Sequence, residues 1–571
     1  MFNYSYNHVL FVFLLIQVSL STATTTSYIP SIYTPTDDQK DRLKQDVKDM
    51  FYHSYDGYLN NAFPMDELKP ISCSGSNTFG EYALTFIDSL DTLALMGNMS
   101  EFKRGVDWII DHTNFDTNKT VSVFETNIRV LGGLLSSHLL AEILLKPTYK
   151  GELLDKALDL GNRLLPAFDT PTGIPYGAVN LKYGVPINET TITCTAAAGT
   201  FSLEFGILSK LTGKSEFEKA ARKSIKSIWE FRSELDLLGN HIDIVDGEWT
   251  IKESGIGTGI DSFFEYLFKS AIYFDDQEYM DIFLASYKAI IKHVKKESWY
   301  VDVSLNKGAI IWPIYNSLQS FWPGLQSMFG QVEDAMGTIK AFHSVWRRYG
   351  FTPEGYNLIS GQVQHGQKGY PLRPELVESL YYLYQTNKDP LFVKMAKDMV
   401  WTLNNVTKVE CGHANIKDVE SHSLDDKMES FFLSETCKYL YLLFSTTSTI
   451  QDNNNVGDSD DSDDGDWFKK LNIIFNTEGH IFPMQYRFFE KSTDSSNNIN
   501  SKEKENADKE NIQQQQQQVG DSKKVKEFEW ICKPMPYLRT ISSGPFQFIG
   551  GYQETEWYED KKILDAIAEF K

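Results

Sequence analysis

The stretch Tyr370-Pro-Leu-Arg-Pro-Glu-Leu-Val-Glu-Ser-Leu-Tyr-Tyr-Leu-Tyr384 carries the pattern on which the rest of the chain is built. Its apolar residues recur at helical spacing and predict a helix that begins at Pro374, which suits the first helical position because it has no N–H to leave unpaired. Glu375 and Glu378 are three residues apart and therefore share a face, with Arg373 beside them. Acids in a first turn also complement the positive end of any helix, so this stretch alone does not indicate a site.

The composition describes a large acidic protein with a substantial core. The chain has 571 residues, of which 42% are hydrophobic and 13% aromatic, and its formal net charge is −22. A charge of that sign argues against nucleic acid or an anionic membrane as a partner. The aromatic content suits flat apolar ligands such as sugar rings.

The amino terminus predicts entry into the secretory pathway. An apolar run from Val9 to Ile16, followed by Ser21-Thr22-Ala23, is typical of a signal peptide over residues 1–23. No later stretch approaches the ~20 apolar residues of a membrane span, so none is expected in the mature chain. Four acceptor triplets agree with this route and predict N-glycosylation at Asn98, Asn118, Asn188 and Asn405.

From Asp37 to about Phe444 the chain alternates helical segments with short loops, while Ile242–Val245 and Ala309–Trp312 are the candidate strands. This order predicts an all-α ring of antiparallel helical hairpins with minor β-hairpins. The expected helices are Lys40–Leu59, Ala83–Leu95, Phe102–Asp111, Ser122–Leu145, Leu153–Leu165, Ala196–Leu211, Ser215–Leu235, Ser262–Phe274, Met280–Lys295, Gln326–Tyr349, Leu376–Gln385, Leu391–Leu403 and Lys427–Leu443.

Two low-complexity segments interrupt this pattern. The ring is expected over residues 37–490, with a disordered acidic insertion at 452–466. The insertion superficially resembles a calcium-binding loop, but the twelfth position of that loop, where a glutamate is required, is Leu471. Residues 492–526 include a glutamine run and cannot bury enough apolar surface to fold. The aromatic-rich tail at 527–571 has no assigned role.

Four further stretches repeat the combination of acids and aromatic rings. Each has an ordinary structural explanation, such as a helix cap, a surface acid or a loop turn, but their recurrence indicates one pocket lined by carboxylates and rings. Glycoside hydrolysis needs such a pocket, because one acid protonates the leaving oxygen while a carboxylate on the other face activates water. Metalloprotease, P-loop and serine-hydrolase motifs are absent from the sequence. The residues concerned are Glu125 and Arg129; Asp261 and Glu265; Phe431 and Glu435; and Thr477, Glu478 and His480.

These stretches resemble glycoside hydrolase family 47, the class I α-mannosidases, and the resemblance runs in the family's order from about Lys40 to Pro483. The segments that carry it are Phe124–Arg129, Asp261–Leu267, Leu372–Ser379, Met428–Thr436 and Phe475–Glu478. Three others most resemble the endoplasmic-reticulum degradation-enhancing α-mannosidase-like (EDEM) branch: Phe51–Asp56, Ala62–Leu68 and Ser434–Tyr441.

The resemblance implies an (α/α)7 barrel, Ca²⁺ at the floor of its pocket and inverting cleavage of α1,2-linked mannose. Glu375 would be the base, and Glu125 and Asp261 catalytic carboxylates, of which either is a candidate proton donor. Thr477 would hold Ca²⁺ through its oxygens. The sugar subsite would be lined by Arg129, Arg373, Glu378, Phe431, Glu435 and Glu478, with Phe431 stacked under the ring.

The EDEM pattern carries two further implications. The processing mannosidases of the family have an arginine where Gly259 stands, so a more open pocket is expected. A disulfide between Cys73 and Cys437 is expected to fasten the barrel.

The function implied is trimming of high-mannose N-glycans on misfolded glycoproteins in the endoplasmic reticulum lumen, which marks them for degradation. The alternative is a catalytically silent glycan-binding receptor, although the complete set of catalytic residues favours the enzyme. A third possibility is that the enzyme works together with a protein disulfide isomerase-type oxidoreductase, linked to it through an unpaired thiol such as Cys532. This would modify the enzymatic function and not replace it.

Overall fold

The computed structural model describes residues 35–445, 468 and 471–484. The signal peptide predicted at 1–23, the acidic insertion at 452–466, the segment at 492–526 and the tail at 527–571, with Cys532, lie outside the described residues.

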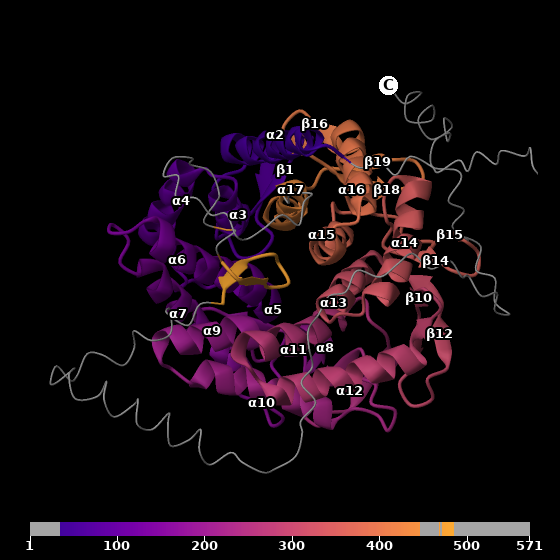
Figure 1. The fold of residues 1–571 in the computed structure, drawn as a ribbon. Coiled ribbons are helices and arrows are strands. Elements are labelled where there is room, and N and C mark those ends of the chain that lie inside the picture. The colour runs from indigo at the N-terminus through magenta and orange to yellow at the C-terminus, as the bar shows by residue number, and fades with distance from the viewer. Residues whose placement is uncertain (1–34, 446–467, 469–470, 485–571) are drawn as a thin grey trace, which may run out of the picture.

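Two concentric layers of helices form a closed (α/α)7 barrel in the described chain (Figure 1). Successive helices alternate between the layers, and the last inner helix packs against the first outer helix, which closes the ring. The outer layer consists of α2 (Asp37–Asn61), α4 (Met99–His112), α7 (Glu152–Leu164), α10 (Glu216–Glu230), α12 (Gln277–His293), α14 (Val332–Tyr349) and α16 (Pro390–Thr402). The inner layer consists of α3 (Leu84–Leu95), α6 (Gly132–Leu144), α9 (Ser202–Thr212), α11 (Asp261–Phe274), α13 (Trp322–Met328), α15 (Glu375–Asn387) and α17 (Cys437–Ser445).

The two layers differ in their pattern of burial. Every residue of α3 is buried, as expected of a helix covered on all sides. In α10 the buried residues Phe217, Ala221, Ile225 and Ile228 follow the helical period, and the opposite face is polar. The predicted all-α architecture is therefore confirmed, with one apolar stripe for each outer helix.

Three predicted helices are interrupted. Ser122–Leu145 consists of α5 (Val123–Glu125), the π-helical turn η1 (Thr126–Leu131) and α6. Ala196–Leu211 divides into α8 (Thr195–Gly199) and α9 because Thr200 leaves the helical region, and Gln326–Tyr349 divides into α13 and α14 at Gly330, which has a φ of +82°. Apolar spacing continues across each break, so periodicity alone does not reveal it.

The inner helix predicted over Lys427–Leu443 starts later, as the π-helical turn η5 (Phe432–Thr436) that leads into α17. Glu375 is the first residue of α15, so that helix begins one residue after the predicted Pro374. Three short turns complete the helical elements: η2 (Leu165–Phe168), η3 (Ser317–Phe321) and the π-helical η4 (Leu403–Thr407).

The described chain also forms small antiparallel sheets of two or three strands. Both predicted strand regions are confirmed by β6 and β12, but the sequence shows few of the others because they are two to four residues long. Besides the last hairpin, the strands are β1 (Glu67–Lys69), β2 (Ser74–Ser76), β3 (Thr120–Ser122), β4 (Ala178–Asn180), β5 (Ile192–Cys194), β6 (His241–Asp243), β7 (Trp249–Ile251), β8 (Glu253–Ser254), β9 (Lys295–Lys296), β10 (Trp299–Tyr300), β11 (Asp302–Ser304), β12 (Ile310–Trp312), β13 (Ile314–Tyr315), β14 (Tyr356–Asn357), β15 (Gln362–Val363), β16 (Lys408–Val409), β17 (Gly412–His413), β18 (Asn415–Asp418) and β19 (Ser423–Asp425).

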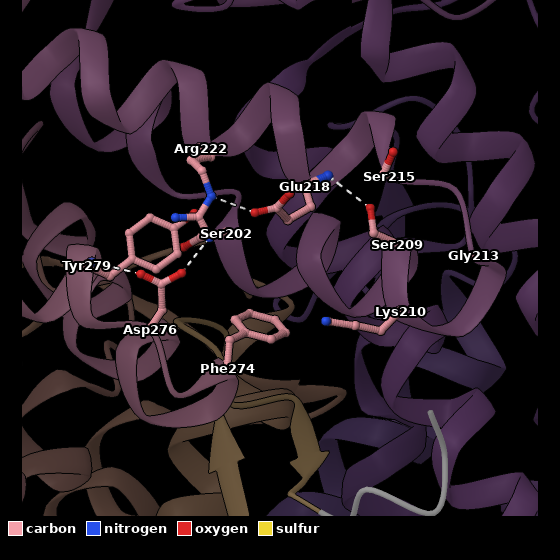
Figure 2. Close-up of a pocket in the computed structure, with 10 residues that line it drawn as sticks. All are labelled: Ser202, Ser209, Lys210, Gly213, Ser215, Glu218, Arg222, Phe274, Asp276 and Tyr279. Carbon is pink, nitrogen blue, oxygen red and sulfur yellow. Dashed lines mark hydrogen bonds and ion pairs between the residues drawn. The ribbon is translucent and has the colours of Figure 1, made fainter. Parts of the chain in front are cut away.

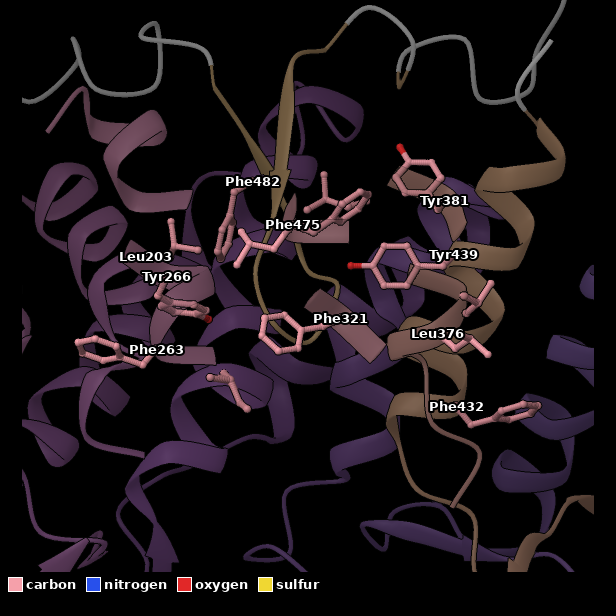
Figure 3. Close-up of a cluster of buried hydrophobic side chains, with 14 of the residues drawn as sticks. Leu203, Phe263, Tyr266, Phe321, Leu376, Tyr381, Phe432, Tyr439, Phe475 and Phe482 are labelled. Atoms are coloured by element: carbon pink, nitrogen blue, oxygen red, sulfur yellow. The ribbon is translucent and has the colours of Figure 1, made fainter. Parts of the chain in front are cut away.

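The last hairpin, β20 (Ile473–Phe475) and β21 (Ile481–Pro483), enters the middle of the ring (Figure 1). Figure 3 shows its side chains Phe475 and Phe482 among buried residues of the inner helices. The Phe475 ring lies 5.4 Å from the ring of Tyr439 and 6.1 Å from that of Tyr381, between centroids. This apolar packing fixes the hairpin, and therefore the loop at its tip, inside the barrel.

The predicted disulfide between Cys73 and Cys437 is wrong, because Cys73 is bonded to Cys411. Cys411 lies in the turn between β16 and β17, which approaches α2 so closely that a Cβ at Gly57 would lie 1.8 Å from the Cys411 carbonyl oxygen. The hairpin of β1 and β2, which carries Cys73, packs on α2 as well. Cys437 is fully buried on the inner wall as a free thiol, so its place next to the closure of the ring does not bring it to Cys73.

The predicted N-glycosylation sites lie in two kinds of position. Asn118, Asn188 and Asn405 are exposed. Asn98 is half-buried and caps α4, where its side chain accepts from the backbone N–H of Glu101. In the part of the chain that the structure describes, no helix combines the length and the apolar character needed to cross a bilayer.

Candidate active site

A cavity of about 300 Å³, called here the central cavity, lies where α11 and α15 begin and the tip of the last hairpin meets them. Elements far apart in the sequence supply its wall. All ten residues predicted for catalysis, sugar binding and calcium line it: Glu125, Arg129, Asp261, Arg373, Glu375, Glu378, Phe431, Glu435, Thr477 and Glu478.

Glu375 stands at the start of α15, with its side chain 15% exposed. Burial raises its pKa to about 7, although the nearby Arg373 guanidinium acts in the opposite direction. Nη1 of Arg373 is 3.7 Å from Oε1 of Glu375, and Oε2 has no hydrogen-bond partner among the described residues. A carboxylate with a raised pKa and a free oxygen is suited to accept a proton from water.

Asp261 and Glu125 are the other two predicted catalytic carboxylates. Asp261 is the first residue of α11, its Oδ1 accepts from the backbone N–H of Ser262 at 2.8 Å, and burial raises its pKa to about 7. Glu125 ends α5, and its Oε2 accepts from Nε of Arg129 at 2.7 Å. Asp261 is thus an acid whose protonated form is favoured by burial, whereas Glu125 is bound to the cation of Arg129.

Arg129 connects the wall of the central cavity to its floor. Its Nη1 is 3.0 Å from Oε2 of Glu478, and its guanidinium carbon lies 5.3 Å from the centre of the Phe431 ring. It lies in the π-helical turn η1, while Glu435 lies in a second one, η5. Such turns often occur at functional sites, because the wider helix reorients its side chains.

Four buried glutamates crowd the floor. Burial and the carboxylates of Glu478 and Glu378 hold the pKa of Glu435 well above its usual range. Burial likewise raises the pKa of Glu478 to about 8, opposed by Arg129. Lys269 forms an ion pair with Glu265 and lies 3.9 Å from Glu378. The repulsion among these acids shows that the floor favours a further positive charge.

The tip of the hairpin is held by a buried polar network that the sequence did not reveal. The buried Glu204 on α9 accepts from Tyr266 Oη at 2.6 Å, and from Nδ2 of Asn476 at 2.8 Å and of Asn127 at 3.0 Å. The backbone N–H of Thr477 points at Tyr266 Oη, 3.5 Å away. The clue in the sequence was a glutamate within an otherwise apolar helix, Ser202–Thr212.

Buried charges anchor the other side of the hairpin tip. His480 lies with Nε2 3.1 Å from Asp88 and Nδ1 3.1 Å from Asp91, both on α3. Nζ of Lys438 is 2.8 Å from Asp91 and donates to the carbonyl of Gly479 at 2.6 Å. Burial opposes a charged ring, but Asp91 and Asp88 outweigh it and raise the pKa of His480 to about 9. In the sequence, this cluster was signalled by the two acids Asp88 and Asp91 inside the otherwise apolar segment that forms α3.

The residues present fit a hard cation such as Ca²⁺. Seven acidic side chains and two arginines line the central cavity. The side-chain atoms with which Thr477 and the adjacent Glu478 could bind a metal are oxygens, which Ca²⁺ prefers. Among the described residues no three His, Cys, Asp or Glu side chains form a direct metal-binding cluster.

A second cavity of about 330 Å³ lies between α9, α10 and α12 (Figure 2). Figure 2 shows Arg222 reaching both Glu218 and Asp276, and with Lys210 the lining has two cations for these two acids. This differs from the central cavity, where acids exceed cations and Glu375 has a free oxygen.

The comparisons with known proteins agree with this geometry. The family model described as Glycosyl hydrolase family 47 matches residues 50–484. Alpha-mannosidase I MNS4 of Arabidopsis thaliana is 53% identical over 451 residues, which cover 78% of this chain and 70% of that protein. ER degradation-enhancing alpha-mannosidase-like protein 2 of Homo sapiens is 48% identical over 443 residues, which cover 76% of this chain and 77% of that protein.

A solved structure is similar as well. The alpha-1,2-mannosidase from Trichoderma reesei superposes with a TM-score of 0.67 at 26% identity, covering 78% of this chain and 99% of that chain. The central cavity, with its acids, its arginines and the hairpin tip at its floor, occurs in a chain that belongs to glycosyl hydrolase family 47.

Proposed function

We propose that this protein is an inverting α-mannosidase that removes α1,2-linked mannose from high-mannose N-glycans. The observation that carries the proposal is the state of Glu375, a largely buried carboxylate with a raised pKa and a free oxygen, in one cavity with Asp261 and Glu125. The names of the relatives, mannosidases and degradation-enhancing mannosidase-like proteins, support the substrate class.

In the proposed reaction the carboxylate of Glu375, whose side chain is 15% exposed, takes a proton from a water molecule that attacks the anomeric carbon. A second carboxyl group gives a proton to the departing glycosidic oxygen, so the two groups exchange charge and the configuration inverts. Asp261 suits the donor role because burial favours its protonated form. Glu125 suits it less, because its Oε2 already accepts a hydrogen bond from Nε of Arg129 at 2.7 Å.

The remaining residues bind and orient the sugar. Phe431 offers an apolar ring face at the cavity, and Arg129 and Arg373 offer N–H donors that hydroxyl groups accept from. Ca²⁺, when bound at Thr477, would supply positive charge and ordered oxygen contacts at the floor. Its charge would offset the repulsion among Glu378, Glu435 and Glu478.

The proposed setting is the lumen of the endoplasmic reticulum, where trimming marks misfolded glycoproteins for degradation. Relatives named ER degradation-enhancing support this setting. An oxidoreductase of the protein disulfide isomerase type remains a proposed partner through Cys532, which is outside the described residues. The buried thiol of Cys437 does not suit that contact.

The first test is release of free mannose from a denatured high-mannose glycoprotein by wild type and by Glu375→Gln, each with and without a calcium chelator. We expect Glu375→Gln to lower kcat by at least about 10²-fold, as loss of a general base does. Chelation should abolish release by the wild type, and Glu420→Gln, an exposed ion-paired glutamate, should leave the rate unchanged.

The outcome also separates the enzyme from the receptor. If the wild type releases no mannose but retains the glycoprotein on a column, the protein is a glycan receptor. If release occurs and nuclear magnetic resonance shows that the first product is α-mannose, the hydrolase stands and inversion is wrong.

A further inference from the structure

Glu354 lies behind the wall of the central cavity and holds one of its arginines. Nε and Nη2 of Arg373 donate to Oε1 and Oε2 of Glu354 at 2.6 and 3.0 Å. This is a bidentate pair, in which one edge of the planar guanidinium meets both carboxylate oxygens. Glu354 itself does not line the cavity, whereas Arg373 does.

The carboxylate of Glu354 is fixed in place by its surroundings. The hydroxyl of Ser317 donates to its Oε1 at 3.1 Å, and Nδ2 of Asn316 donates to its backbone carbonyl at 2.6 Å. Its own N–H donates to the carbonyl of Gly369 at 2.9 Å. Two other segments of the chain therefore hold Glu354, and through it they hold the plane of Arg373.

This arrangement decides what Arg373 can do to Glu375. With two of its nitrogens committed to Glu354, Arg373 turns only Nη1 toward Glu375, and the 3.7 Å to Oε1 is beyond a normal hydrogen bond. Among the described residues Oε2 of Glu375 has no partner. A guanidinium without Glu354 would form its bidentate pair with the next carboxylate, which is that of Glu375.

We propose that Glu354 is a positioning residue that keeps Arg373 from pairing with Glu375, so that the catalytic base stays free to accept a proton. This rests on the proposed function, because it assigns Glu375 as the base. Glu354 acts only through Arg373.

The other charges around Glu375 agree with this role. Burial is the main cause of its raised pKa, Arg373 lowers it, and the charges of Glu354 and Asp261 raise it. Loss of the Glu354 charge lowers the pKa of Glu375, and so does a turn of Arg373 toward Glu375. The two effects of removing Glu354 therefore act in the same direction. The titratable and charged groups that face Glu375 are Asp261 from α11, Glu378 from α15, Glu435 from η5, Tyr315 from β13, and Arg373, Glu354 and Tyr370 from the loops.

The test is the pH dependence of kcat/KM for mannose release by the full-length protein, comparing wild type with Glu354→Gln. The base must be ionised, so activity falls as pH decreases through the pKa of Glu375. In Glu354→Gln we expect that acid limb to move down by about one pH unit, as a carboxylate gaining an arginine partner does. We also expect kcat to fall and KM to rise, because the Arg373 that turns toward Glu375 is itself a sugar-binding residue of the cavity.

Three further variants complete the design. Glu354→Ala also frees Arg373 and should shift the limb in the same direction, so the test does not depend on one variant folding. Glu354→Asp keeps the charge and should stay nearer the wild-type limb. Glu278→Gln removes a carboxylate paired with Arg222 on the outer layer and should leave the profile unchanged.

An acid limb that stays in place, or moves to higher pH, in both Glu354→Gln and Glu354→Ala would overturn this role. A wild type that releases mannose normally would then leave the proposed function intact. A wild type without activity would remove both proposals together.

Discussion

At the scale of single residues, His480 shows how a buried charge holds the site together. Its folded pKa of about 9 lies above the ~6.5 of an unfolded histidine. The stability that it contributes is therefore fully present below about pH 6.5 and is lost as pH rises through about 9.

We expect His480→Asn to lower the free energy of unfolding by about 3 kcal/mol at pH 6, as loss of a buried ionic partner does. The deficit should narrow toward pH 9.5, where the wild-type ring is neutral. Urea unfolding at both pH values measures this, and His365→Asn, at an exposed position, is the control. A deficit that does not change with pH would mean that the ring is neutral in the folded protein.

Residues whose role depends on their own chemistry could be found in the sequence, and those whose role depends on a partner could not. All ten predicted cavity residues reach the central cavity. Asp261 and Glu375 do so because each begins an inner helix, and Thr477 and Glu478 because they lie at the tip of the last hairpin. Glu354 is in a loop without periodicity and becomes meaningful only once Arg373 is seen against it. Glu204 and Asp88 could have been suspected, since a buried acid needs a partner.

At the scale of elements, the last hairpin depends on the glycine pair at the start of α6. A Cβ at Gly132 would lie 2.7 Å from Nδ2 of Asn476 and 2.9 Å from Cδ2 of His480. Contacts this short force the hairpin tip to move.

We therefore expect Gly132→Ala to lower the free energy of unfolding by about 1–3 kcal/mol and to weaken calcium binding. The first is measured by denaturant unfolding and the second by calorimetric titration with Ca²⁺. Gly337→Ala in the outer helix α14 is the matched control, since the nearest atom to its Cβ is a serine hydroxyl at 3.2 Å. Equal calcium affinity in Gly132→Ala and wild type would show that the tip of the last hairpin accommodates the added methyl group.

Helices were the most predictable elements, because their amphipathic period extends over several turns. The π-helical turns η1 and η5 were not predictable, since one extra residue per turn leaves the apolar pattern on either side unchanged. Most strands were missed because two or three residues are too few to show alternation.

At the scale of the whole molecule, the ring is fastened by a disulfide between Cys73 and Cys411, which are 338 residues apart in sequence. Such a link removes much of the freedom of the unfolded chain. We expect Cys411→Ser to lower the free energy of unfolding by about 5 kcal/mol. Cys194→Ser removes a free, half-buried thiol and is the control for thermal unfolding.

A peptide map under non-reducing conditions checks the pairing itself. It should yield a fragment that joins Cys73 to Cys411, and one that joins Cys73 to Cys437 would contradict the structure. The fold class followed from the sequence, but this pairing did not, because it depends on how two hairpins pack against α2.

The position of the last hairpin has a consequence for biosynthesis. The floor of the central cavity comes from Thr477 and Glu478, while its wall begins with Phe124. A ribosome must therefore deliver more than 350 residues after the first wall residue before the floor exists. Until then the growing chain has the wall residues of the cavity but no assembled floor, so the acceptor triplets at Asn118 and Asn188 are synthesised well before the cavity of the same chain is complete.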